Sequence, residues 1–174
     1  MRSIRLFLVA SSLVLAVALL AAPAARAACT CDNTIIGTSG DDYLTGGTGS
    51  DCIYAGDGGD LVYSYEGNDC LYGEGGPDGL YAGTGDDEVY AGPSGTYGDY
   101  ADGWMGTDYI DGGDDADILT GYNGNDTILG GSGNDQCIGE GDNDTLIGDD
   151  GTDYVNGSTG TDTCDAETEV NCEF

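Results

Sequence analysis

The chain has 174 residues, among them 33 glycines, 33 acidic residues, three basic residues and no histidine, for a formal net charge of −30. The basic residues are Arg2, Arg5 and Arg26, so the sequence after position 27 can form no internal salt bridge. This composition excludes nucleic acid and anionic membranes as direct electrostatic partners, and it lacks the bases and cationic clamps of common catalytic sites, which predicts that the protein is not an enzyme.

The first 27 residues have the features of a secretory signal peptide. Arg2 and Arg5 precede the apolar stretch from Leu6 to Ala22, and Ala25-Arg26-Ala27 supplies a small-x-small cleavage pattern. The stretch is short for a membrane-spanning helix, which is the alternative. We therefore predict that residues 1–27 are cleaved and that the protein is secreted. Losing three positive charges takes the net charge from −30 to about −33.

Residues 37–165 repeat with a period of nine. An aspartate recurs in every repeat, an apolar or small residue follows it two positions later, and a glycine precedes most of these aspartates by two. One interval, between Asp87 and Asp99, has three extra residues and contains Pro93. The repeated acids are Asp42, Asp51, Asp60, Asp69, Asp78, Asp87, Asp99, Asp108, Asp117, Asp126, Asp135, Asp144, Asp153 and Asp162.

Each repeat reads as a glycine-rich turn followed by a short strand. Glycine permits the turn, and the x-apolar-x segment after each aspartate places its middle side chain on one face of a strand. Two repeats complete one coil, so strands eighteen residues apart should stack at about 4.8 Å. High acidity and glycine content alone would suggest disorder, but this periodic order instead predicts an all-β solenoid.

The segments GGTGSDCIY, GYNGNDTIL and GGSGNDQCI resemble the haemolysin-type, or repeats-in-toxin (RTX), consensus G-G-x-G-x-D-x-U-x. The resemblance implies a right-handed parallel β-roll in which calcium binds between stacked turns. Its ligands would be carboxylates and backbone carbonyls, with each aspartate paired to the one eighteen residues on, such as Asp42 with Asp60 or Asp51 with Asp69. At most about 12 ions fit this scheme.

The resemblance assigns the repeated aspartates as metal ligands. The assignment is doubtful at Asp99, because the three extra residues and Pro93 distort its turn. The expected ligands are Asp42, Asp51, Asp60, Asp69, Asp78, Asp87, Asp108, Asp117, Asp126, Asp135, Asp144, Asp153 and Asp162. Because one small apolar side chain per repeat makes a thin core and the acids repel one another, we expect calcium binding and folding to be coupled.

The ends depart from the repeat. Residues 28–36 are expected to form a partial first coil, and residues 166–174 a C-terminal cap held by a disulfide between Cys164 and Cys172. Cys52 and Cys70 are eighteen residues apart and should face outward on neighbouring strands, which predicts a second disulfide. Cys137 occupies an inward position and is expected to be a buried hydrophobe.

Tyrosines follow the inward residue in five successive repeats. Because alternate repeats belong to opposite sheets, Tyr54, Tyr72 and Tyr90 should stack on one face. Two functions are compatible with this sequence. The first is a secreted calcium-binding protein; the alternative is an extracellular adhesion, matrix or carbohydrate-binding module that uses the tyrosine face, with a cell-surface or polysaccharide partner.

Overall fold

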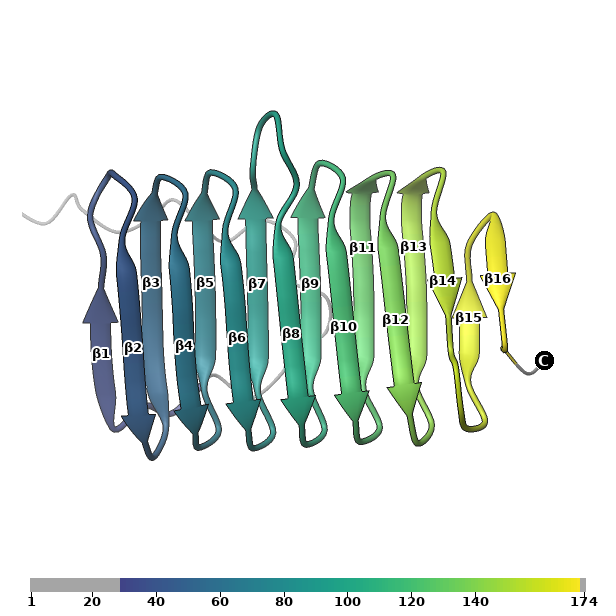
Figure 1. Cartoon of the computed structure of the whole chain (residues 1–174), viewed down its shortest axis with the longest axis horizontal. Helices are drawn as coiled ribbons and strands as arrows, with labels where there is room; N and C mark the ends of the chain where they lie inside the picture. Colours follow the sequence, from purple (N-terminus) through teal and green to yellow (C-terminus); the bar gives the residue numbers. More distant parts are fainter. Residues whose placement is uncertain (1–28, 173–174) are drawn as a thin grey trace, which may run out of the picture.

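The computed structural model describes residues 29–172, which coil into sixteen short strands connected by tight turns (Figure 1). The described residues contain no helix. The fold is an all-β solenoid in which each strand pairs in parallel with the strand one coil away on either side, or on one side at the ends of the two sheets, as the repeat predicts. The predicted signal peptide, residues 1–27, lies outside the described residues.

The odd-numbered strands form one eight-stranded sheet, in which sequential odd strands are neighbours. Apart from β1, each strand begins at or just after a repeated aspartate, and its residues alternate between outward and inward directions. The members are β1 (Asn33–Ile36), β3 (Asp51–Asp57), β5 (Cys70–Gly75), β7 (Glu88–Pro93), β9 (Tyr109–Asp114), β11 (Thr127–Gly133), β13 (Thr145–Gly151) and β15 (Thr163–Asp165).

The even-numbered strands form the second eight-stranded sheet, again in sequential order. The two sheets face each other across the core and are joined at both edges by the turns that carry the aspartates (Figure 1). The members are β2 (Tyr43–Thr48), β4 (Leu61–Glu66), β6 (Gly79–Thr84), β8 (Tyr100–Met105), β10 (Ile118–Asn123), β12 (Gln136–Gly141), β14 (Tyr154–Asn156) and β16 (Thr168–Val170).

The strand register follows the period of the sequence. Thr127 lies opposite Thr145, one full coil further on. Across the longer interval the pairing shifts by the three extra residues, so Glu88 lies opposite Tyr109. The extra residues form the long loop between β7 and β8 that projects from one edge in Figure 1, with Tyr97 74% exposed. The insertion is therefore absorbed by a turn and leaves both sheets continuous.

The core consists of two inward columns per sheet rather than the single column expected from sequence. The predicted apolar residues, such as Ile53, Leu119 and Leu146, are fully buried. A second inward residue follows two positions later, because side chains of a strand alternate with period two. It is small, as at Ala55 and Ala82, and these alanines belong to the same buried cluster. The small second residue lets the two sheets approach closely.

Truncation of one inward leucine tests this packing. We expect Leu119→Ala to lower the free energy of unfolding by about 2–5 kcal/mol, because it leaves a cavity in a fully buried column. Its strand neighbour Ile118 is 45% exposed, so Ile118→Ala should cost less than about 1 kcal/mol. Urea unfolding of both variants at one fixed calcium concentration measures the difference. Equal destabilisation of the two variants would contradict the assigned register.

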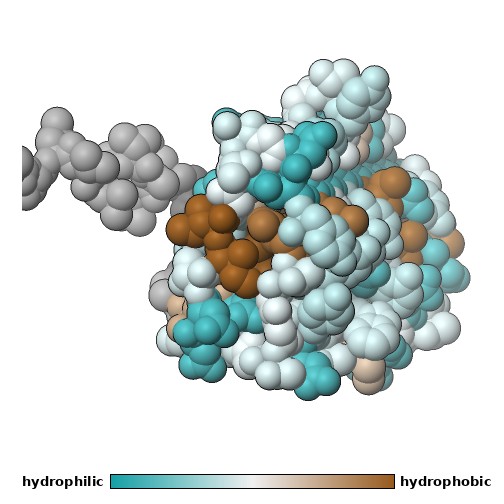
Figure 2. Space-filling view, turned by 60° about the vertical axis from the view of Figure 1, so that its left-hand side comes forward, coloured by the Kyte–Doolittle hydropathy of each residue, from teal (hydrophilic) through white to brown (hydrophobic). Residues whose placement is uncertain are grey.

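The two ends of the solenoid extend the sheets. At the start, β1 pairs with β3, so residues 33–36 supply the edge strand of a partial coil. Figure 2 shows apolar side chains gathered on this end; Ile36 is 74% exposed, and Ile35 and Leu44 pack partly against the core. At the other end β16 pairs with β14, so the segment predicted as a cap contributes a strand. The domain boundaries themselves stay predictions.

The prediction of a disulfide between Cys52 and Cys70 is wrong. Their Cα atoms are opposite one another in register, as expected. However, Cys52 is bonded to Cys31, and Cys70 is bonded to Cys29. The sulfur atoms of Cys31, Cys52 and Cys70 all lie within 4.8 Å of one another, so the segment before β1 brings both of its cysteines against this pair. The two bonds fasten that segment across β3 and β5.

The other cysteines are placed as predicted. Cys164 and Cys172 form a disulfide that closes the last coil, with their Cα atoms 5.9 Å apart. Cys137 is the free cysteine of the chain and is fully buried in the core. Burial, together with nearby carboxylates such as Asp135, raises the pKa of its thiol to about 12. Cys137 is therefore a small hydrophobe rather than a reactive thiol.

The outward tyrosines form a ladder on each sheet. Tyr54, Tyr72 and Tyr90 stack nearly parallel on the first sheet, with ring centroids 4.7 and 5.2 Å apart. They are half-buried rather than exposed, and the Tyr72 hydroxyl contacts the sulfur of Cys29. On the second sheet Tyr63 and Tyr81 stack in the same way, at 4.7 Å. These contacts stabilise neighbouring coils, and the segment around Cys29 contacts the first ladder.

Candidate calcium sites

The repeated aspartates form two columns, one along each edge of the solenoid where a turn enters a strand. Thirteen of the fourteen are buried, with 1–4% of their surface exposed, and Asp42 in the first complete turn is half-buried. Within a column the carboxylates succeed one another at the spacing of the strands, about 4.8 Å. A charged side chain is rarely buried without a partner of opposite charge. The sequence after position 27 has no basic side chain, so no residue there can be that partner.

One carboxylate oxygen of each of the thirteen buried aspartates accepts a hydrogen bond from the preceding coil. The Oδ1 atom of Asp69 accepts a hydrogen bond from the backbone N–H of Asp51 at 2.8 Å, and Asp87 does the same for Asp69 at 2.7 Å. The carbonyl of each aspartate also accepts from the next coil, as in the bond from Glu88 N–H to Asp69. Aspartates one coil apart, eighteen residues in most cases and twenty-one across the insertion, are therefore hydrogen-bonded along both columns.

Asp99, the doubtful member, occupies the same position as the others. Its Oδ1 atom accepts from the N–H of Asp78, and its own N–H donates to Asp117, both at 2.7 Å. Its side chain is 2% exposed. The extra residues lie before Asp99 in the turn, so the loop bulges outward and the column continues. Asp99 therefore has the same hydrogen-bonding geometry as the other twelve buried aspartates of the columns.

Asp42 differs from the rest. Its Oδ2 atom accepts hydrogen bonds from the backbone N–H and the hydroxyl of Thr38, at 2.6 and 2.8 Å. In the other thirteen aspartates the Oδ2 atom is buried and has no hydrogen-bond partner among the described residues. The turn at Asp42 thus satisfies its carboxylate within the protein, whereas the later turns leave one acceptor open.

Two polar side chains close the columns, and the sequence analysis missed both. Asn33 Nδ2 donates to Oδ1 of Asp51 at 2.8 Å, one coil before the first aspartate of that column. At the opposite end of the solenoid, in the other column, the N–H of Asp153 donates to Oε2 of Glu167 at 3.1 Å. This hydrogen bond holds the pKa of Glu167 below its ordinary value. Asn33 is in phase with the repeat, which is the signal that could have identified it.

A second ladder runs along the exposed side of the turns. The residue before several of the aspartates accepts a hydrogen bond from the backbone N–H one coil further on. Examples are Asn125, which accepts from Asn143 N–H at 2.9 Å, and Asn143, which accepts from Thr161 N–H at 2.9 Å. The sequence carries this signal as a recurring Asn or Asp at the position before the repeated aspartate. Stacked turns are therefore joined on both their buried and exposed sides.

Beside most of the open carboxylate oxygens a glycine leaves space for an ion, whereas Ala55, Ser64 and Ala82 occupy the equivalent positions before Asp60, Asp69 and Asp87. A Cβ atom on Gly130 would lie 2.7 Å from Oδ2 of Asp135 and 2.7 Å from the carbonyl oxygen of Gly148, one coil further on. Glycine therefore leaves a small space between a carboxylate and a carbonyl of the next turn. The other column repeats this arrangement, since a Cβ atom on Gly46 would meet Asp51 Oδ2 at 2.6 Å. A cation placed there would receive oxygen donors from two coils.

The electrostatics of the columns also require positive charge. Burial, opposed by a hydrogen bond from the Asp87 N–H and reinforced by the carboxylates of Asp87 and Asp126, raises the pKa of Asp108 to about 8. The pKa of Asp117 rises to about 8 for the same reasons. The pKa of Asp144 rises to about 7. Near neutral pH these groups therefore need either a proton or a bound cation to be stable in the fold.

The donor set selects the kind of cation. Carboxylate and carbonyl oxygens are hard ligands, and they suit calcium, magnesium or manganese rather than zinc or copper. Donors supplied by two stacked turns favour calcium, because it accepts six to eight oxygens at variable distances. Among the described residues, the sulfur atoms that lie close together belong to cysteines that are paired in disulfides. They therefore offer no competing thiolate site for a metal.

Comparison with known protein families agrees with this geometry. The RTX calcium-binding nonapeptide repeat (4 copies) matches the chain at residues 32–62, 53–80, 63–93, 95–137 and 138–166. These matches cover most of the chain. The protein therefore belongs to the RTX calcium-binding repeat family, whose β-roll is a structural calcium-binding fold. Calcium is accordingly the ion that its repeats bind.

No curated protein matches the chain. Within residues 29–172, the structure contains no helix of the length and apolar character needed to cross a bilayer. The family membership therefore identifies the fold and the ion, and it does not identify a biological partner.

Proposed function

We propose that this protein is secreted, binds calcium in the stacked turns along both edges of its solenoid, and folds when it does so. The ligands are the open Oδ2 atoms of the thirteen buried aspartates from Asp51 to Asp162, with backbone carbonyls of the glycine-rich turns. Asp42 is the weakest candidate, because Thr38 already occupies its second oxygen. The number of ions is at most about 12, one for each pair of stacked turns.

The observation that carries the proposal is the column of buried carboxylates without counter-charge. Each has one oxygen in a hydrogen bond to the neighbouring coil and one oxygen without a partner. An unpaired buried charge is costly, so a fold made of such columns is stable only if something neutralises them. Calcium between successive turns supplies that charge and links the coils at the same time.

Secretion is supported by the sequence of residues 1–27 and by the cysteines. Arg2, Arg5 and the apolar stretch from Leu6 are the features of an export signal. Six of the seven cysteines pair in disulfides, which persist in oxidising compartments and not in the cytosol. Extracellular calcium is also abundant enough for weak sites. Folding would then follow export, because the ion is scarce inside the cell.

We also propose that the protein has no catalytic activity. The sequence after position 27 has no histidine, lysine or arginine. The repeated aspartates serve the coil-to-coil ladder, and the free thiol of Cys137 is buried. A structural role for the solenoid accounts for every repeated feature of the sequence.

Equilibrium dialysis of residues 28–174 against calcium tests the assignment. The unmodified chain should bind several ions, up to about 12, and should not bind magnesium at the same concentration. Asp108 lies between Asp87 and Asp126 in its column, so Asp108→Asn should remove one or two ions. The matched control is Asp150→Asn, an exposed carboxylate outside the columns, which should keep the full number. An equal count in both variants would overturn the ligand assignment.

A further inference from the structure

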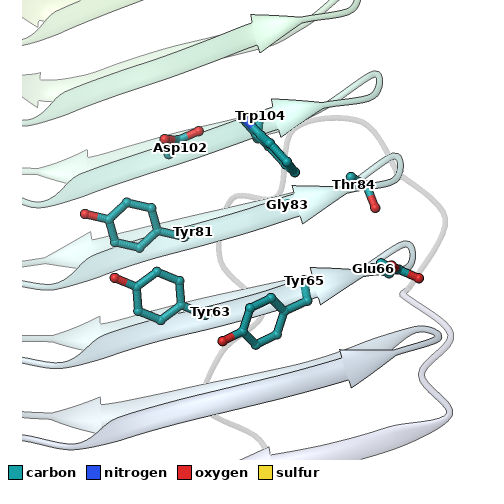
Figure 3. Close-up of a pocket in the computed structure, with 8 residues that line it drawn as sticks. All are labelled: Tyr63, Tyr65, Glu66, Tyr81, Gly83, Thr84, Asp102 and Trp104. Atoms are coloured by element: carbon teal, nitrogen blue, oxygen red, sulfur yellow. The ribbon is translucent and has the colours of Figure 1, made fainter.

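The outer face of the second sheet carries an aromatic pocket that the calcium sites do not use. Its volume is about 560 Å³, within the range of small-molecule sites. Figure 3 shows the side chains around it, which come from three neighbouring strands, β4, β6 and β8. The residues that define its shape are Tyr63, Tyr65, Tyr81, Gly83, Asp102 and Trp104.

The register of the sheet makes the pocket a slot between two aromatic rings. Tyr65, Gly83 and Trp104 lie opposite one another on successive strands. Gly83 contributes no side chain, and its φ of +107° together with the close carbonyl of Tyr65 leaves no room for one. The Cα atoms of Tyr65 and Trp104 are therefore separated by two strand spacings, about 9.6 Å. The Tyr65 ring also stacks on Tyr63, with centroids 6.2 Å apart, so the space above Gly83 is bordered by Tyr65 with Tyr63 on one side and by Trp104 on the other.

The aromatic surface at the slot is exposed. Tyr65 and Trp104 are each 51% exposed. The neighbouring column supplies the stacked rings of Tyr63 and Tyr81, whose centroids are 4.7 Å apart, as one wall. In Figure 3, Trp104 and Tyr65 lie on either side of Gly83, and Tyr81 lies beside it. A guest above Gly83 would thus meet aromatic side chains on three sides.

The charge around the slot is negative. Asp102 lies in register with Tyr81, and its Oδ1 atom is buried without a hydrogen-bond partner among the described residues. Glu66 lies at the opposite rim, on the strand of Tyr65. The sequence after position 27 offers no basic side chain to neutralise either carboxylate. The negative faces of aromatic rings and two carboxylates favour a positively charged guest.

We propose that this pocket binds a small soluble organic cation with a quaternary ammonium group, seated over Gly83 between Tyr65 and Trp104. A quaternary ammonium has no N–H to donate, so aromatic faces and nearby carboxylates satisfy it without further acceptors. A neutral sugar would gain no charge attraction from Asp102 and Glu66, whereas a cation does. A phosphate-bearing head group would be repelled by Asp102, Glu66 and the net charge of the protein.

Trp104 is the only tryptophan of the chain, so its fluorescence reports on the slot directly. The probe is choline chloride, added to the calcium-loaded protein at constant ionic strength. The controls are 3,3-dimethyl-1-butanol, which has the same shape without charge, and phosphocholine. We expect a saturable change with choline and at least about tenfold weaker binding of both controls. Equal binding of the uncharged alcohol, stronger binding of phosphocholine, or no saturation with choline would each overturn the proposal.

Three variants locate the binding. Tyr65→Ala and Asp102→Asn should each weaken choline binding at least about fivefold, whereas Tyr97→Ala should leave it unchanged. Tyr97 is an exposed tyrosine in the β7–β8 loop and is absent from the pocket lining. If a pocket variant fails to fold, as judged by circular dichroism, the comparison of choline with its uncharged analogue on the unmodified chain decides alone. Because all measurements use folded, calcium-loaded protein, failure here leaves the calcium proposal intact.

Discussion

Removal of calcium from residues 28–174 is expected to abolish the β-sheet signal of the protein, and calcium should restore it cooperatively. This is the largest effect that the structure predicts, because it concerns the whole fold. The affinity should be of the extracellular type, with half-restoration at about 10⁻⁴ to 10⁻³ M calcium. Far-UV circular dichroism from chelated buffer to about 10 mM calcium measures it.

The reason lies in the imbalance between the core and the charged columns. The apolar core has one large side chain per repeat, such as Leu71 or Ile110, and a small partner such as Ala82 or glycine. Against it stand thirteen buried aspartates whose ionised forms have no counter-charge. Because native proteins are only marginally stable, repulsion along both columns is enough to favour the unfolded chain. Calcium is expected to bind the folded arrangement preferentially and so to shift the equilibrium back.

Two controls sharpen the calcium experiment. Magnesium at the same concentration should restore little signal, because it demands octahedral geometry and retains its water. The protein must be oxidised, since the disulfides of Cys29 and Cys31 fasten the first coils and that of Cys164 closes the last. A full β signal in chelator would contradict coupled folding and would assign the stability to the disulfides and the tyrosine ladders instead.

The architecture was predictable from the sequence because the repeat is periodic. A spacing of nine fixes which residues face inward and a spacing of eighteen fixes which strands are neighbours, so the register of Tyr54 with Tyr72 follows directly. The aspartate columns follow for the same reason. Spacing alone did not predict whether the three-residue insertion before Asp99 interrupts its column. That outcome depends on whether the extra residues can form a loop outside the column.

The features that escaped prediction are those outside the period. Cys29 and Cys31 precede the first repeat, so nothing in the spacing indicates that they reach Cys70 and Cys52. The caps at the ends of the columns are also aperiodic; Glu167 is fourteen residues from its partner. The aromatic slot depends on three non-equivalent residues, two large and one glycine, meeting across strands. The period of the sequence predicts the solenoid, but it does not predict features that depend on single positions, such as these disulfides, the column ends and the slot.

A second large effect is expected from pH: lowering the pH should fold the calcium-free chain. Burial and neighbouring carboxylates raise the pKa of Asp78 and Asp87 to about 7, and of Asp108 to about 8, above the value near 3.9 of an unfolded chain. Groups with a raised folded-state pKa bind protons more tightly in the fold. Their contribution to stability is fully present below pH ~4 and is lost as the pH rises through 6 to 8.

Protons should therefore replace calcium in neutralising the columns. Circular dichroism of the calcium-stripped protein between pH 8.5 and pH 5 should show little β signal at the alkaline end and a gain toward the acid end. Calcium must be removed by a resin rather than left to a chelator, because chelators release calcium as they are protonated. The range stops above the isoelectric point of the full chain, about 4.1, because loss of net charge promotes association.

The variant Asp108→Asn separates the two neutralising agents. It removes one of the most strongly shifted carboxylates, so it should need less acid to fold without calcium while binding fewer ions with calcium. Asp150→Asn should change neither property. A β signal at pH 5 that depends on protein concentration would indicate association rather than folding, and sedimentation at two concentrations distinguishes the cases. A calcium-free chain that stays unfolded from pH 8.5 to pH 5 would show that repulsion between the aspartates is not what keeps it open.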